Sequence, residues 1–165
     1  MSGYYELLDV DKLTVGAIGE PGHRLFLLQA RHGGQVITLK MEKTQVAALS
    51  VYLANLLRDM PAPGELPQDL ELEEPTEPEW VVGTLGVSYD AEVDRMLLVA
   101  DEAVGEDETG AQARIGATRA QVAALAMRGT ELVQAGRPPC PLCGYPLDPS
   151  GHACPRTNGH RPPTL

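Results

Sequence analysis

Aromatic residues and basic residues are both scarce in this chain. Only 4% of its 165 residues are aromatic, with one Phe and one Trp, so a folded core has to be built from Leu, Val, Ile and Ala. The formal net charge of −10 at pH 7 argues against a protein that binds duplex nucleic acid, which needs a basic surface. Apolar runs of the roughly 18 residues that span a membrane are also lacking. The first residues contain neither a basic stretch nor an apolar run, so we expect a cytoplasmic protein with no membrane partner.

The acidic residues gather in two segments. Residues 61–79 hold five prolines and seven carboxylates, and residues 101–110 hold five carboxylates, with no Lys or Arg in either segment. The remainder of the chain is therefore close to neutral. Because proline density and charge repulsion favour an extended, solvated chain, we expect residues 61–79 to be a linker whose role is spacing and solubility.

An internal repeat divides the chain. The string QVAAL occurs at 45–49 and again at 121–125, and a Gly-x-x-Gly pair precedes each copy, at 16–19 and 83–86. Recurrence of the same markers in the same order indicates a duplication. The paired glycines predict bulges or places where another part of the chain approaches the backbone closely. A phosphate cradle is the alternative, but neither pair is followed by the Lys that such a loop uses.

Each copy shows three short apolar segments separated by turn residues and followed by an amphipathic helix. The predicted strands are 13–19, 23–31 and 35–41 in the first half, and 80–89, 95–103 and 111–118 in the second. Apolar residues at helical spacing then run from Val46 to Met60 and from Val122 to Val133, and Thr118-x-x-Gln121 predicts a capping box. The sequence therefore predicts an α+β protein made of two duplicated βββα units that share one core. Its divisions are a first βββα half (1–60), an acidic linker (61–79), a second βββα half (80–136) and a tail (137–165).

All three cysteines lie in the tail, where proline is too frequent for a hydrophobic core. Cys140-x-x-Cys143-Gly has the spacing of a metal knuckle, and Cys154 supplies a third thiolate. A histidine completes a tetrahedral Zn²⁺ site, and spacing alone leaves the choice open between His152 and His160. Because a Cys₃His set leaves no open coordination position, we expect a structural zinc ion that stabilises the tail. A redox pair at Cys140 and Cys143 is the alternative, but it leaves Cys154 unexplained.

Three stretches resemble a family of uncharacterised actinobacterial proteins of unknown function, which have a duplicated α+β body and a zinc-ribbon-like tail. These stretches are VGAIGEPGHRLFLLQARHGG (15–34), EKTQVAAL (42–49) and CPLCGYPLDPSGHACPRTNG (140–159). In the tail pattern of this family the fixed positions match Cys140, Cys143, His152 and Cys154. The resemblance therefore implies that His152, rather than His160, is the fourth zinc ligand. It also implies a bacterial cytoplasmic protein that acts with kinase-like or phosphatase-like protein partners.

Patterns for catalysis are weak, because no serine lies in a Gly-x-Ser-x-Gly elbow, and we assign no catalytic residue. Arg24 and Arg95 begin corresponding strands, and together with Arg31 they are candidates for an anion-binding face between the halves. Three hypotheses follow. The first is a non-enzymatic binding or adaptor protein with a protein partner. The second is an enzyme or enzyme subunit that acts on a phosphorylated or anionic small ligand between the halves, and the third is RNA binding through the tail.

Overall fold

The computed structural model describes residues 3–20 and 22–135, and it confirms a mixed α+β fold. Two sheets and two helices make up this part of the chain. After a short first strand, the order of elements is βββα twice, which is compatible with the predicted repeat. Neither of these two helices is long and apolar enough to cross a membrane. The strands are β1 (Tyr4–Leu7), β2 (Lys12–Ile18), β3 (Leu25–His32), β4 (Gln35–Met41), β5 (Val82–Asp90), β6 (Arg95–Glu102) and β7 (Gln112–Ala117), and the helices are α1 (Lys43–Arg58) and α2 (Arg119–Ala135).

The strands are shared unequally between the two sheets. β2, β3 and β4 form one antiparallel meander, and β5, β6 and β7 form a second. β1 joins the second sheet, where Tyr4 lies opposite Gln112 in a parallel pairing with β7. The sequence patterns predict no strand at this position. The first 60 residues therefore supply one strand to the sheet of the second half.

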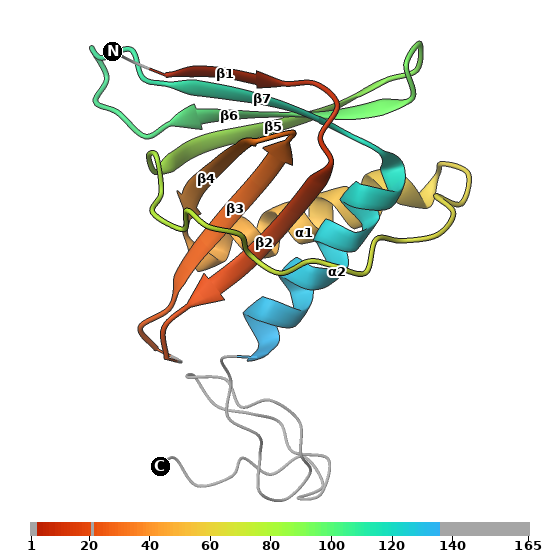
Figure 1. The fold of residues 1–165 in the computed structure, drawn as a ribbon, viewed down its shortest axis with the longest axis horizontal. Coiled ribbons are helices and arrows are strands. Elements are labelled where there is room, and N and C mark those ends of the chain that lie inside the picture. Colours follow the sequence, from red (N-terminus) through yellow and green to blue (C-terminus); the bar gives the residue numbers. More distant parts are fainter. Residues whose placement is uncertain (1–2, 21, 136–165) are drawn as a thin grey trace, which may run out of the picture.

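Both sheets and both helices contribute to one hydrophobic core, which is built mainly from aliphatic side chains. Among its fully buried members are Leu28 of β3, Leu53 of α1, Leu98 of β6 and Leu125 of α2. Figure 1 shows the two helices next to each other, and they contact one another along their length. A side chain on Gly129 of α2 would collide with the hydroxyl of Ser50 in α1. Gly129 therefore lets the two helices approach closely.

The acidic linker lies against the first sheet. Residues 61–79, hereafter the strap, cross the face of β2–β3–β4 that is turned away from the helices (Figure 1). Thr14, Gln29 and Thr38 are neighbours in register on this face, and all three are buried. Their side chains donate hydrogen bonds of 2.6, 2.7 and 2.8 Å to the strap carbonyls of Leu70, Glu73 and Pro75, respectively. Because buried polar groups need such partners, the strap makes this polar row compatible with burial.

Ion pairs hold the strap in the same place. Lys12 Nζ lies 3.3 Å from the carboxylate of Asp69 and 3.4 Å from that of Glu73, and Arg31 Nε lies 3.0 Å from Glu73. The hydrogen bond from Arg31, assisted by Lys12, keeps the pKa of the Glu73 carboxyl below its usual value. The expected solvated spacer is thus a covering segment. Its composition does keep the chain extended, but the extended chain meets a sheet face of complementary polarity and charge.

Two of the predicted glycine positions have a reason within the fold. A Cβ on Gly16 would lie 2.5 Å from side-chain atoms of Leu72 in the strap. A Cβ on Gly83 would lie 2.9 Å from the Cα of Ala103, and the register of β5 is irregular at this point, between Val82 and Thr84. Both glycines therefore mark close approaches, as the sequence predicts.

Candidate functional site

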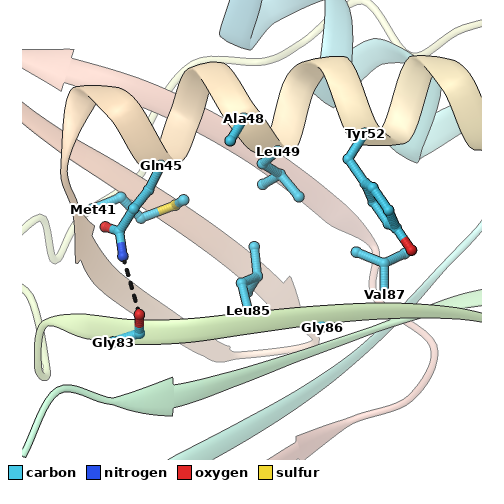
Figure 2. Close-up of a pocket in the computed structure, with 9 residues that line it drawn as sticks. All are labelled: Met41, Gln45, Ala48, Leu49, Tyr52, Gly83, Leu85, Gly86 and Val87. Atoms are coloured by element: carbon cyan, nitrogen blue, oxygen red, sulfur yellow. Dashed lines mark hydrogen bonds between the residues drawn. The ribbon is translucent and has the colours of Figure 1, made fainter.

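An apolar cleft of about 500 Å³ lies between α1 and β5 (Figure 2). This volume is in the range of sites that bind small molecules or side chains of a partner. Tyr52 of α1 points down toward β5, and Leu85 and Val87 of β5 point up toward α1. None of the lining residues is charged. They are Met41, Gln45, Ala48, Leu49, Tyr52, Gly83, Leu85, Gly86 and Val87.

The first turn of α1 is tied to β5 by one glutamine. The backbone N–H of the N-cap residue Glu42 donates to Oε1 of Gln45 at 2.7 Å, which is half of a capping box. Nε2 of Gln45 donates to the carbonyl of Val82 at 2.9 Å and to that of Gly83 at 3.4 Å. Figure 2 shows the contact with Gly83 at one end of the cleft. Gln45 thus both begins the helix and positions it over the edge of the second sheet.

The second copy of QVAAL makes an equivalent contact. Thr118 and Gln121 form the predicted capping box, with hydrogen bonds of 2.8 and 3.0 Å in the two directions. Nε2 of Gln121 then donates to the carbonyl of Val10 at 2.9 Å. Each repeated glutamine therefore connects its helix to the other half of the chain. A cleft of about 260 Å³ lies beside Gln121 as well, but it is lined by charged residues such as Lys12 and in part by the strap.

Exposed apolar side chains occur on the two elements that form the cleft. The buried stripe of α1 includes Val46, Leu49 and Leu53, and Tyr52 lies beside this stripe with half of its surface exposed. Val51 and Tyr89 are exposed as well. Exposed apolar surface that continues into a cleft is typical of an interaction site.

The structure does not gather the three predicted arginines in one place. Arg24 precedes β3 and Arg31 lies near its far end, so the two are roughly 20 Å apart at the usual rise of a strand. Arg31 is paired with Glu73, and Arg95 at the start of β6 is paired with Asp9 at 3.3 Å. Figure 1 shows the β2–β3 turn and the β5–β6 turn far from each other. An anion-binding face in which Arg24 and Arg95 meet is therefore not formed.

The predicted zinc ligands fall outside the described residues. This applies to Cys140, Cys143, His152 and Cys154, and to the alternative ligand His160. Within residues 3–20 and 22–135, no group of three or more His, Cys, Asp or Glu side chains is arranged to hold a metal ion.

Four residues of the apolar cleft belong to the repeated markers of the sequence, but the repeat does not predict that they line one cleft; they are Gln45, Leu49, Gly83 and Gly86. The predicted close approach at Gly86 was one signal of a site. Tyr52 offered another, because an exposed aromatic residue lies beside the apolar stripe of an amphipathic helix. Neither signal places α1 over β5, which depends on packing between distant parts of the chain.

The fold and the cleft together define a mixed α+β protein with an apolar groove between a helix and an edge strand. The model of the family described as Protein of unknown function (DUF3090) matches residues 5–154, and the chain belongs to this family. The comparisons with curated proteins and with solved structures gave no match.

Proposed function

We propose that this protein is a binding or adaptor protein that holds an apolar segment of a protein partner in the cleft between α1 and β5. The observation that carries the proposal is the cleft itself, with its volume of about 500 Å³ and its uncharged lining. Grooves between a helix and a strand suit extended peptides, whose side chains fill the groove. Tyr52 at the rim supports the same function, because tyrosine is enriched in protein-binding surfaces.

Peptides selected on the full-length protein from a random phage library test this proposal. Ala48 is exposed and lines the cleft, so Ala48→Trp fills the cleft without changing the core. Ala54→Trp makes the same change at an exposed position of α1 outside the lining, and it is the matched control. We expect the selected peptides to bind Ala48→Trp at least about tenfold more weakly than the wild type, a difference of about 1.4 kcal/mol.

The control variant should bind these peptides like the wild type, and urea unfolding should show that both tryptophan variants are folded. Peptides that bind Ala48→Trp as tightly as the wild type would show that the cleft is not the binding site. A selection that yields no cleft-dependent peptide would have the same meaning.

The tail belongs to the proposal as a structural zinc site. The spacing of Cys140, Cys143 and Cys154 supports three thiolate ligands, and His152 is proposed as the fourth ligand. Metal analysis of protein purified without added metal should give about one zinc per chain. His152→Ala should lose more zinc than His160→Ala. A protein with reactive thiols and far less than one zinc per chain would refute the site, and the reverse order of the two variants would make His160 the ligand.

A further inference from the structure

β5 has a free edge in the described part of the chain. It pairs with β6 along its length. On its other side an isolated bridge joins Lys40 to Val81, and Gln45 donates to the carbonyls of Val82 and Gly83, so the edge is free from Thr84 onward. Residues 82–89 contain no charged side chain. Proteins usually protect sheet edges from pairing with other chains by short strands, charges or prolines. β1, at the other edge of the same sheet, is protected in this way, because it is four residues long and contains Glu6.

Gly86, in the middle of β5, has no reason within the described fold to be glycine. A Cβ built on Gly86 meets no atom within 4 Å, in contrast to the close contacts at Gly16 and Gly83. Its φ angle is not positive, so the backbone does not require glycine either. Glycine inside a strand often marks a place where another backbone or a ligand approaches closely. Gly86 lines the cleft, and the space beside it is therefore available to a second chain (Figure 2).

One end of the cleft is acidic. Asp90 ends β5 and Glu92 lies in the turn that follows, and both are exposed. Neither carboxylate forms an ion pair in the described part of the chain, and Arg95, which lies opposite Asp90 in register, pairs with Asp9. At the other end, the exposed Glu42 caps α1 beside the exposed Lys43, so the two charges balance. A bound segment of complementary charge therefore has an apolar centre and carries a basic residue at the end that lies beside Asp90 and Glu92.

From these observations we infer that the segment held in the cleft pairs its backbone with the free edge of β5 and has an apolar centre with Lys or Arg at the end beside Asp90 and Glu92. The inference rests on the proposed function, because it describes the occupant of the same cleft. Backbone hydrogen bonds supply affinity in this mode of binding, and the cleft selects alternate side chains. The acidic end then determines which segments bind.

The experiment uses the peptides whose binding depends on the cleft. Each is resynthesised with a single N-methyl amide, moved one position at a time, and its affinity for the full-length protein is measured by fluorescence anisotropy. In an added strand, alternate N–H groups face the neighbouring strand. We therefore expect losses of about tenfold or more at every second position and little change between them. These peptides should also carry Lys or Arg at one end.

A pair of charge variants tests the acidic rim. Asp90→Asn combined with Glu92→Gln should weaken the peptides at least about threefold at low salt and reduce the salt dependence of binding. Glu106→Gln combined with Asp107→Asn, which removes two charges from the loop between β6 and β7, should leave binding unchanged.

Equal losses of affinity at every methylated position would overturn the inference that the peptide pairs with β5 as an added strand. Peptides without a basic end, insensitive to the rim variant, would overturn the charge assignment. In both cases the separate effect of Ala48→Trp would keep the cleft as a binding site, so the two proposals can fail independently. Dimerisation of the wild type that disappears in Ala48→Trp, measured by sedimentation, would assign the cleft to a second copy instead.

Discussion

The two sheets of this protein differ in what lies against them. The outer face of β2–β3–β4 is closed by the strap, whose backbone carbonyls satisfy a row of buried polar side chains. β5 at the edge of the other sheet faces a cleft, and its central glycine has open space beside it. The side chains on these strands differ accordingly: β2, β3 and β4 carry a buried polar row, whereas residues 82–89 of β5 are uncharged. A polar row that must be buried needs a cover from its own chain, whereas an uncharged edge beside a cleft can accept a strand from another chain.

The largest loss of stability should come from displacing the strap from the sheet β2–β3–β4, hereafter the closed sheet. Gly16→Val places a branched side chain where Leu72 lies, so it should displace the strap and uncover the polar row. We expect the free energy of unfolding, measured with urea, to fall by about 3 kcal/mol. Gly86→Val makes the same change in β5, where nothing lies within 4 Å, and should cost far less. Similar losses in both variants would contradict the distinction between the two sheets.

The strap should also respond to acid. Because the pKa of Glu73 is lower in the folded protein than in the unfolded chain, its ion pairs stabilise the fold fully above the unfolded value of about 4.3. This contribution is lost as the pH falls through the lower, folded value. The wild type should therefore be more stable than Glu73→Gln at pH 7, and the two should converge below about pH 4. Urea unfolding at several pH values measures this difference.

Glu77→Gln, which removes an exposed carboxylate from the same strap, is the control for the acid experiment. It should follow the wild type across the pH range. A constant difference between the wild type and Glu73→Gln at all pH values would show that the charge of Glu73 does not hold the strap.

The smallest change in stability is expected in β5, beside the cleft. Gly86→Ala adds a Cβ that meets no neighbour, and alanine restricts the unfolded chain more than glycine does. The free energy of unfolding should stay the same or rise by up to about 1 kcal/mol. A clear loss of stability in the urea curve would show that Gly86 has a role within the fold, and it would remove one of the two observations on the β5 edge.

Most of the secondary structure was predictable because its signals are local. Short apolar segments bounded by turn residues located β2 to β7, and the pair Thr118 and Gln121 located the start of α2. β1 was missed because it has only four residues, and its pairing partner β7 lies more than 100 residues away. The repeated glutamines Gln45 and Gln121 were visible as a repeat. Their contacts with Val82 and Val10 are tertiary and could not be read from the string.

The strap and the cleft were not predictable for a different reason. Prolines and carboxylates in residues 61–79 are typical of a solvated chain, and nothing local indicates that Thr14, Gln29 and Thr38 form one row. That row exists only after three strands have paired in register. The cleft likewise depends on the position of α1 over β5, which follows from tertiary contacts such as that of Gln45 with Val82.

The pairing of β1 with β7 sets an order of events during synthesis on the ribosome. All strands of the first sheet, and the strap carbonyls that satisfy its polar row, are present once residue 79 has emerged, whereas α2, which packs on β2, follows later. β1 has no partner strand until β7 follows, which at the usual rate of translation takes about 5 to 20 s. We therefore expect the closed sheet to fold while the chain is still being made, and the sheet that carries the cleft to form last.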